Sequence, residues 1–235
     1  PMAHLQPLSG AKLVLATMGL ALVTFMTVLD TTIANVAVHT ISGNLGASSS
    51  QGTWVITFFG VANAVSIPLT GWLAKRLGEV KLFLTATMLF IATSWLCGMS
   101  ASLGMLIFFR IIQGAVAGPL IPLSQSLLLA CYPPKMRGMA LAMWSMTIIV
   151  APICGPIIGG WICDNHHWSW IFFINVPMGM LLFALLLKIL KGRETETMRR
   201  PIDKVGLTLL VLAVGCFQLM LDEGKDNDWF NSNYI

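Results

Sequence analysis

Charged side chains are scarce in this sequence. They make up 10% of its 235 residues, while 56% of the residues are hydrophobic; an ordinary soluble domain has about 25% charged residues. So little charge cannot solvate a compact fold of this size, whereas a lipid-facing surface needs none. The composition therefore excludes a soluble globular protein and indicates a membrane protein. The net charge of +4 fits basic loops on one side of a membrane, and nucleic-acid binding is not expected.

Motifs of covalent chemistry and of metal binding are also lacking. The sequence has no HExxH pair, no Ser/His/Asp arrangement, no phosphate-binding glycine loop and no CxxC pair. Its five cysteines lie in or beside apolar segments, so we expect free thiols, with a Cys97–Cys163 bond as the alternative. The adjacent His166 and His167 fit an interfacial loop. We expect no cofactor and no metal site, and an enzyme is the weakest functional class.

Seven long apolar runs are separated by short polar segments. A membrane-crossing helix needs about 20 apolar residues, and no run shows the period-two alternation of a transmembrane barrel. The sequence therefore predicts an all-α integral membrane protein. The first run lacks a signal-peptide cleavage site and is expected to stay in the mature protein. The runs cover residues 13–38, 52–74, 82–99, 103–130, 138–163, 170–190 and 205–221.

The cations predict the orientation. With a cytoplasmic amino terminus, twelve of the 14 Lys and Arg residues fall on the inside; only Lys225 falls outside, and Arg110 lies within an apolar run. Cytoplasmic loops carry an excess of Lys and Arg. We therefore expect a multi-pass protein with a cytoplasmic amino terminus.

Two ionisable residues, Asp30 and Arg110, stand inside apolar runs. Counted along their helices at 1.5 Å per residue, both lie about 10–12 Å below the outer surface, so they can pair. Charge inside a membrane is costly and is usually paired or functional. Two interpretations remain open: a carboxylate whose protonation is coupled to conformation, with Arg110 tuning its affinity for protons, or a static salt bridge between two helices.

Further polar side chains accompany this pair. Thr27, Thr31 and Asn35 lie in the same run as Asp30 and either line a pathway or form hydrogen bonds between helices. Gln113 follows one turn after Arg110 on the same face. We expect Thr27, Thr31, Asn35 and Gln113 to supply polar contacts in a cavity.

The fifth run has an unusual pattern of proline and glycine. Pro152 and Pro156 each lack a backbone donor and favour a kink, whereas Gly155 and Gly159 remove side chains from one face. Together with Gly160, they predict a helix that bends and slides. Such a helix suits alternating exposure of a cavity rather than catalysis.

These segments resemble motifs of the major facilitator superfamily, and within it the fourteen-helix EmrB/QacA-type drug:proton antiporters, including their fatty-acid-resistance branch. Gly155, Pro156, Gly159 and Gly160 match the antiporter motif of helix 5. Residues 29–37 resemble the helix 1 motif, Arg110 with Gln113 and Gly114 resembles the helix 4 motif, and residues 168–177 resemble the entry to helix 6.

The loop between the second and third runs departs from the family pattern Gly-x-Leu-Ala-Asp-Arg-x-Gly-Arg. Here the loop reads Gly71, Lys75, Arg76, Gly78 and Glu79 at the defining positions, so the acid and the distal base are exchanged. Lys75 cannot act as the acid of a charge lock, and Glu79 is a candidate replacement. Membrane topology alone is an equal explanation of the cations.

The resemblance also implies a domain organisation. Residues 1–190 would form an amino-terminal six-helix bundle, residues 191–204 a cytoplasmic linker, and residues 205–235 a seventh helix and the start of an outer loop. The second half of such a transporter would then be absent from this sequence. Transport sites of this architecture form between the two halves.

The function that the resemblance implies is proton-coupled export of hydrophobic or amphipathic toxic compounds across the bacterial inner membrane. The proton gradient would supply the energy without a cofactor, and a periplasmic adaptor and an outer-membrane channel would be partners. Asp30 would carry protons, Arg110 would bias that step, and the fifth run would gate. The alternatives are a facilitator without proton exchange and a non-transporting membrane scaffold or sensor.

Overall fold

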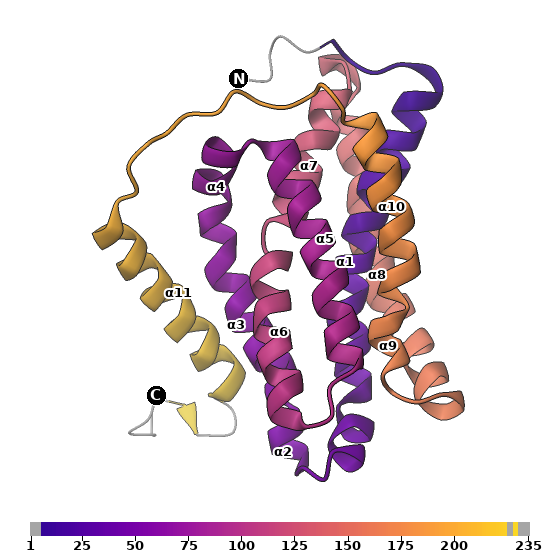
Figure 1. Cartoon of the computed structure of the whole chain (residues 1–235), viewed down its shortest axis with the longest axis vertical. Coiled ribbons are helices and arrows are strands. Elements are labelled where there is room, and N and C mark those ends of the chain that lie inside the picture. The colour runs from indigo at the N-terminus through magenta and orange to yellow at the C-terminus, as the bar shows by residue number, and fades with distance from the viewer. Residues whose placement is uncertain (1–5, 225–227, 230–235) are drawn as a thin grey trace.

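A computed structural model describes residues 6–224, 228 and 229 of the chain, and within these residues the regular structure is entirely helical (Figure 1). Seven stretches are long and apolar enough to cross a membrane, and each overlaps one of the seven predicted runs. The predicted all-α membrane architecture is therefore confirmed. The stretches are Gly10–Asn44, Ser49–Leu77, Glu79–Gly98, Leu103–Cys131, Pro134–Asn165, Trp170–Ile189 and Lys204–Glu223.

Several of these stretches contain more than one helix. The long α-helices are α1 (Gly10–Asn44), α5 (Glu79–Gly98), α8 (Arg137–Asn165) and α11 (Lys204–Glu223). The second stretch comprises α2 (Ser49–Gly52), α3 (Trp54–Ser66), η1 (Ile67–Leu69) and α4 (Thr70–Leu77). The others comprise α6 (Leu103–Ala117), α7 (Leu120–Cys131), η2 (Pro134–Met136), α9 (Trp170–Phe173) and α10 (Asn175–Ile189).

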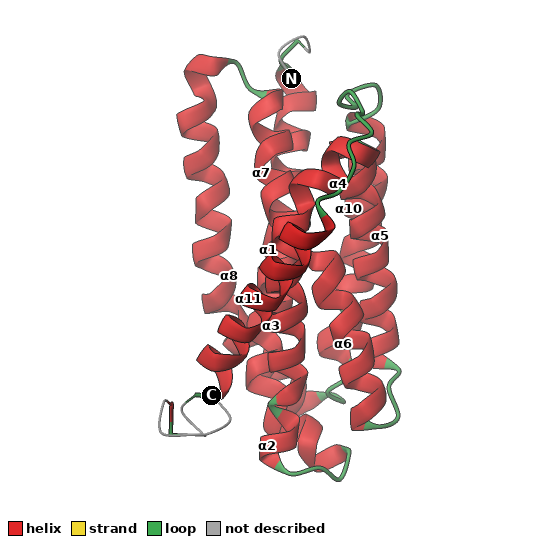
Figure 2. Ribbon diagram, turned by 90° about the vertical axis from the view of Figure 1, so that its left-hand side faces the viewer, coloured by secondary structure: helices red, strands yellow, loops and turns green. Residues whose placement is uncertain are grey.

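Some of the interruptions fall at prolines outside the fifth run. Pro68 lies in the 3₁₀ turn η1, and Pro119 lies in the turn between α6 and α7, directly before α7 begins. By contrast, α8 continues as one helix through Pro152 and Pro156 (Figure 2). Both prolines lie on the exposed side of α8, so their rings do not press on a packed neighbour, and the backbone hydrogen bonds that they cannot make are missing on that side only.

Helix α1 is the centre of the bundle. It packs against α8, α7, α10 and α3, and its contact with α8 is the most extensive in the protein. Two apolar clusters surround it, one that includes Leu20 and Met26 and a second that begins at Ile33. Asp30 lies between them on the same helix. The core of the protein is therefore divided into two apolar layers with a polar layer in between.

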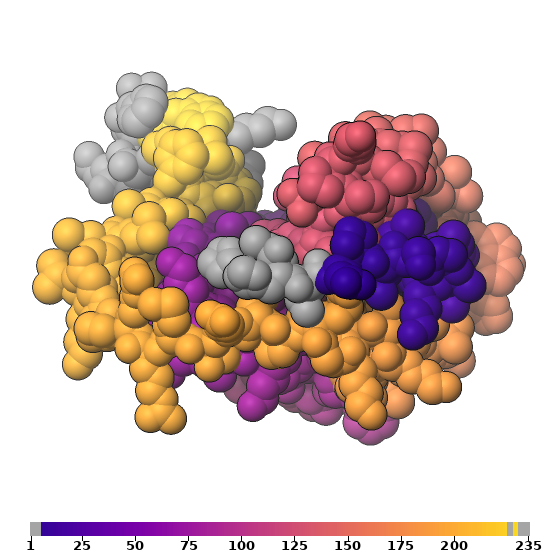
Figure 3. Space-filling model, turned by 90° about the horizontal axis from the view of Figure 1, so that it is seen from above, coloured from indigo at the N-terminus to yellow at the C-terminus, as the bar shows by residue number. Residues whose placement is uncertain are grey.

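Most of the basic loop residues lie at one end of the bundle, which we call the basic end. It is the end where α4 finishes and α5 begins, and it carries Lys75, Arg76, Lys81 and Arg193. The segment between α10 and α11 crosses this end, as Figures 1 and 3 show. We call residues 193–198 of that segment the basic-end strap.

Helix α11 stands apart from the other helices. None of its residues is buried, and it lies obliquely against α3 (Figure 2). Asp203 begins it by accepting a hydrogen bond from the amide of Gly206 at 3.0 Å. The outer loop expected after the seventh helix lies largely outside the described residues.

Candidate functional site

The two intramembrane charges meet. Nη1 of Arg110 on α6 lies 2.6 Å from Oδ2 of Asp30 on α1, and both side chains are fully buried. The depth count along the two helices thus gave the right contact. Because neither group reaches water, each depends on the other for neutralisation.

Arg110 is held from three further directions. Its Nε donates to the backbone carbonyl of Val55 on α3 at 3.3 Å, and Nη1 also donates to Oε1 of Gln113 at 2.9 Å. The guanidinium lies 3.9 Å from the ring centroid of Phe59, a cation–π contact that is strong when desolvated. Nη2 of Arg110 and Nε2 of Gln113 are buried without a hydrogen-bond partner among the residues that the structure describes. Each retains a free donor facing the interior.

The second carboxylate oxygen of Asp30 has a partner that the sequence did not reveal. Nδ2 of Asn175, the first residue of α10, donates to Oδ1 of Asp30 at 3.1 Å and to Oγ of Ser94 on α5 at 3.0 Å. Ser94 in turn donates to the carbonyl of Phe172 at 2.7 Å. An asparagine two residues before Pro177 in an apolar run is a visible signal for Asn175, but nothing in the sequence distinguishes Ser94.

These side chains form one unit, which we call the ion-pair cluster: Asp30, Ser94, Arg110, Gln113 and Asn175. Its members come from α1, α5, α6 and α10, and each is at most 1% exposed. Cys97 adjoins the cluster, with its thiol 3.6 Å from Oε1 of Gln113. The arrangement can hold a negatively charged carboxylate at Asp30. Chemically, that carboxylate can bind a proton, which would neutralise its charge.

The other predicted polar residues of α1 do not join this cluster. Thr27 and Thr31 donate to carbonyls of their own helix, those of Val23 at 2.8 Å and Thr27 at 3.3 Å. The expected hydrogen bonds between helices are therefore not made by these two hydroxyls. Asn35 lies on the exposed face of α1. Along the face from Thr27 to Asn35, exposure increases toward the end of the helix.

A second buried polar group lies nearer the basic end and was not predicted. Nε1 of Trp144 on α8 donates to Oγ1 of Thr24 and Oγ of Ser124, each at 3.1 Å, and the two hydroxyls are 2.7 Å apart. These three residues join α1, α7 and α8 without a charge. Their role is to satisfy polar atoms where three helices meet.

The glycines of the fifth run permit the close approach of α8 to α1. A Cβ atom on Gly155 would overlap the side chain of Thr32, and one on Gly159 would lie 2.9 Å from Cγ1 of Ile33. A Cβ on Gly160 would meet nothing within 4 Å. Two of the three motif glycines are thus required by packing directly beside Asp30.

The loop motif between α4 and α5 lies under the basic-end strap. The carboxylate of Glu194 accepts hydrogen bonds from the amides of Val80 at 3.0 Å and Lys81 at 2.8 Å, and Oγ1 of Thr195 accepts one from the amide of Glu79 at 3.1 Å. The strap therefore caps the amino terminus of α5, where three backbone donors have no partner within the helix.

Each residue of the loop motif has a different position. Gly78 has φ +92°, which favours glycine, and a Cβ there would collide with Glu194. The carbonyl of Lys75 accepts a hydrogen bond from the amide of Met198 at 2.8 Å. The guanidinium of Arg76 lies 5.3 Å from the ring of Trp72. Gly71 has open space where a Cβ would be.

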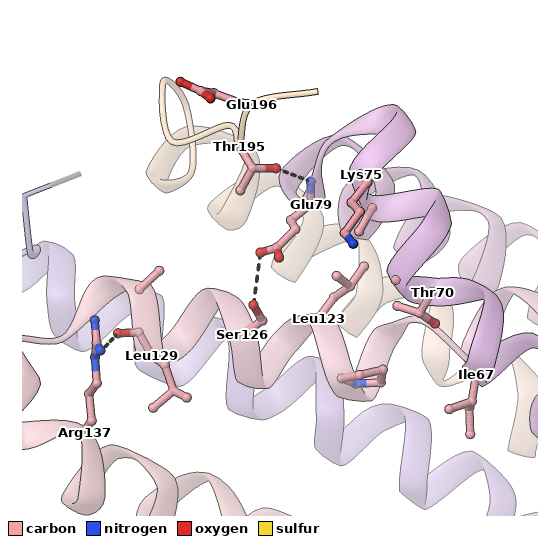
Figure 4. A pocket seen from close by; sticks show the side chains of 14 residues that line it. Ile67, Thr70, Lys75, Glu79, Leu123, Ser126, Leu129, Arg137, Thr195 and Glu196 are labelled. Atoms are coloured by element: carbon pink, nitrogen blue, oxygen red, sulfur yellow. Dashed lines mark hydrogen bonds between the residues drawn. The ribbon is translucent and has the colours of Figure 1, made fainter. Parts of the chain in front are cut away.

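A cavity of about 610 Å³ opens beside this motif, between α4, α7 and the strap (Figure 4). The carboxylate of Glu79 enters it and accepts a hydrogen bond from Ser126 at 3.1 Å. Lys75, Arg137 and Glu196 also line it. Basic and acidic side chains from the helices and from the strap therefore line the same cavity. In the part of the chain that the structure describes, no group of three or more His, Cys, Asp or Glu residues could hold a metal ion.

Comparison with known proteins gives consistent results. Residues 20–221 match the family described as the Major Facilitator Superfamily. The chain is 69% identical to the multidrug export protein EmrB of Haemophilus influenzae, over 97% of this chain and 45% of that protein. It is 61% identical to the fatty acid resistance protein FarB of Neisseria gonorrhoeae, again over 97% and 45%. The chain thus spans about half the length of the curated relatives that it matches.

Solved structures share the fold. A peptide transporter POT crystallised with sulfate superposes with a TM-score of 0.69 at 17% identity, over 92% of this chain and 47% of that one. An inward-facing bacterial homologue of the human lysosomal transporter Spinster gives a TM-score of 0.63 at 20% identity, over 85% and 47%. At these identities the likeness establishes the fold.

Proposed function

This chain belongs to the major facilitator superfamily, and from this premise we propose that it forms one half of a proton-coupled exporter of hydrophobic or amphipathic toxic compounds. The family resemblance read from the four motifs is confirmed by the comparisons. A second bundle of the full-length protein would complete the transport pathway. The relatives named for multidrug export and fatty acid resistance support this class of substrate.

The observation that carries the proposal is the buried Asp30–Arg110 pair. Both side chains are fully buried, and the described residues contain seven candidate membrane spans. Ionisable groups are retained in such positions mainly where they serve a pathway or relay. Protonation of Asp30 would remove the charge that opposes Arg110 and weaken the link between α1 and α6. Proton binding would therefore bias the arrangement of these two helices.

Around this pair, the other predicted residues have supporting roles. Gln113 orients the guanidinium, and the exposed Asn35 and half-buried Thr31 would face the transport cavity. Gly155 and Gly159 would let α8 slide along α1, with Pro152, Pro156 and Gly160 shaping its exposed side. The proton gradient would be the energy source, with no cofactor.

The placement in the membrane follows from charge. We propose that the basic end faces the cytoplasm and that the membrane is the bacterial inner membrane, because cations collect in cytoplasmic loops. The loop motif with Lys75 and Glu79 would then lie at the cytoplasmic surface. A periplasmic adaptor and an outer-membrane channel would meet the opposite side.

The test uses the full-length protein in liposomes with an imposed pH gradient. An amphipathic dye, rhodamine 6G, is the probe, and its export is compared for the wild type, Asp30→Asn, and the control Asp164→Asn at the exposed end of α8. We expect gradient-dependent export by the wild type and the control, and loss of at least 90% of it in a folded Asp30→Asn.

Other outcomes point to the alternatives. Dye flux that persists after the gradient is collapsed would indicate a facilitator. A folded wild type that moves neither this dye nor other amphipathic compounds would favour a membrane scaffold with a static pair. Full export by Asp30→Asn would move the proton site to the second bundle.

A further inference from the structure

The hydrogen bonds on the far side of Asp30 have a fixed direction. The amide nitrogen of Asn175 donates both of its hydrogens, one to Asp30 and one to Ser94, and the Ser94 hydroxyl donates to the carbonyl of Phe172. An ionised carboxylate and a backbone carbonyl can only accept. While Asp30 is ionised, every donor in the row of bonds from Asp30 to Phe172 therefore has an acceptor, and no group in the row needs a further partner.

Proton binding at Oδ1 of Asp30 gives this oxygen a hydrogen that needs an acceptor. The new O–H must donate, but Asn175 presents an N–H to it, and the guanidinium of Arg110 offers only donors. The conflict is removed if the Asn175 amide turns over, so that its Oδ1 accepts from Asp30. Ser94 then has to donate to that same oxygen, and its hydroxyl leaves the Phe172 carbonyl.

We propose that Asn175 and Ser94 form a hydrogen-bond switch that transmits proton binding at Asp30 to the junction between α9 and α10. The switch rests on the proposed function, in which Asp30 carries the proton. The proton comes from water to Oδ1 and returns to water, Arg110 stays charged, and no other bond is made or broken except hydrogen bonds. Asn175 and Ser94 are positioning residues, since neither takes the proton.

The junction is suited to respond. Helix α9 has four residues and stops at Ile174, and α10 starts at Asn175 itself. Pro177 has no amide hydrogen to donate back to α9. Phe172 is fully buried and its ring lies 5.6 Å from the Arg110 guanidinium. Without Ser94, the Phe172 carbonyl would keep, among the described residues, only the amide of Ile174, the residue that joins α9 to α10, as a donor. Losing one of two donors at a buried carbonyl is unfavourable, so the junction shifts.

Asn175 is the residue that binds Oδ1 of Asp30, and the charged and titratable groups of the surrounding helices lie elsewhere. From α6 comes Arg110, which binds the other oxygen, and from α5 comes the thiol of Cys97. Helices α2, α3 and α9 contain no ionisable side chain. Those of α7, α8 and α10 are Cys131, Arg137, Cys154, Cys163, Asp164 and Lys188.

The test titrates Asp30 directly in the substrate-free, full-length protein. Infrared difference spectra record the carbonyl stretch of the protonated carboxyl, and Asp30→Asn identifies the band that belongs to Asp30. The variants are Ser94→Ala and Asn175→Leu. The control is Thr93→Val on the same helix, because Thr93 donates only to carbonyls of α5, those of Leu89 and Phe90.

The switch predicts a change in the titration midpoint. Ser94→Ala removes two hydrogen bonds from the ionised arrangement and one from the protonated arrangement, and Asn175→Leu removes a donor to the carboxylate. Both should move the pH at which the Asp30 band appears away from the wild-type value, while Thr93→Val leaves it in place. Backbone hydrogen exchange at residues 171–178 should rise when Asp30 is protonated, and Ser94→Ala should show that faster exchange at high pH as well.

The outcomes separate this proposal from the function on which it rests. If Asp30 titrates but Ser94→Ala and Asn175→Leu titrate like the wild type, the switch is wrong and proton carriage by Asp30 stands. If the Asp30 band is absent at every pH at which the protein is folded, both ideas fail. If Thr93→Val shifts the midpoint as much as Ser94→Ala, the effect is general loosening of α5 and the switch is rejected.

Discussion

The ion-pair cluster and the basic-end strap both join helices through polar groups, but they differ in burial and in the atoms that they use. In the cluster, side chains from α1, α5, α6 and α10 bind one another, and none is more than 1% exposed. In the strap, the exposed Glu194 and its neighbour Thr195 bind backbone amides at the start of α5. One region neutralises charge within the membrane, and the other caps a helix end.

The difference lies in what happens when a contact opens. If the strap lifts from α5, water can take its place at the amides, so the change in free energy is small. If the cluster opens without protonation of Asp30, two charges remain buried and unpaired, which is strongly unfavourable. A transporter can therefore use the cluster to couple movement to proton binding, whereas the strap can only adjust the stability of one end.

The largest effect is expected from breaking the ion pair itself. Arg110→Met leaves the Asp30 carboxylate buried without its cation and should lower the free energy of unfolding by about 3–5 kcal/mol. Thermal or denaturant unfolding of the full-length protein in detergent measures this. The double variant Asp30→Asn with Arg110→Met should regain much of the loss. If Arg110→Met is as stable as the wild type, the ion pair does not contribute to the free energy of unfolding, and the prediction is wrong.

The next effect concerns the other side of α1, where α8 packs beside the cluster. Gly155→Ala puts a methyl group against Thr32 and should cost about 1–3 kcal/mol in unfolding free energy. Gly160→Ala is the matched control in the same helix, because its methyl group meets no neighbour, and it should be neutral or slightly stabilising. Equal effects of the two substitutions would contradict the close contact.

A smaller effect is expected at the strap. Glu194→Ala removes the acceptor of the Val80 and Lys81 amides and should cost about 1 kcal/mol, as loss of a helix cap does. Hydrogen exchange at these two amides should accelerate about fivefold. Glu196→Ala, two residues along the strap, is the control and should leave the exchange unchanged. Acceleration in Glu196→Ala alone would show that a different residue caps α5.

The smallest expected effect is that of salt, which should weaken the contacts of the strap but not those of the ion-pair cluster. Between about 0.1 M and 1 M ionic strength the Debye length falls from about 10 Å to about 3 Å. The exchange difference caused by Glu194→Ala should shrink by roughly half, while the stability loss of Arg110→Met should stay constant. A strongly salt-dependent Arg110→Met would mean that water reaches the ion pair.

The two regions also differ in how far the sequence predicts them. Asp30 and Arg110 are conspicuous because a charge in an apolar run is rare, and the rise per residue of a helix is enough to place them at one depth. The glycine motif likewise predicts a tight contact, although the sequence alone does not name α1 as the partner. The seven helices follow directly from the lengths of the apolar runs.

The remainder depends on contacts between residues far apart in the chain. Ser94 resembles any serine in a membrane helix until α10 brings Asn175 beside it. Glu194 is one of several charged residues in a loop, and only the folded chain places it on Val80 and Lys81. Asn35 is polar and lies on the same run as Asp30, yet its position on the helix turns it away from the cluster.

The central claim is that the buried Asp30 exchanges a proton as substrate binds. The most direct test is to count protons released when rhodamine 6G is added to the full-length protein in weakly buffered detergent solution. The account predicts proton release by the wild type and by Asp164→Asn, and none by a folded Asp30→Asn that still binds the dye. Equal proton release by Asp30→Asn and the wild type would contradict it.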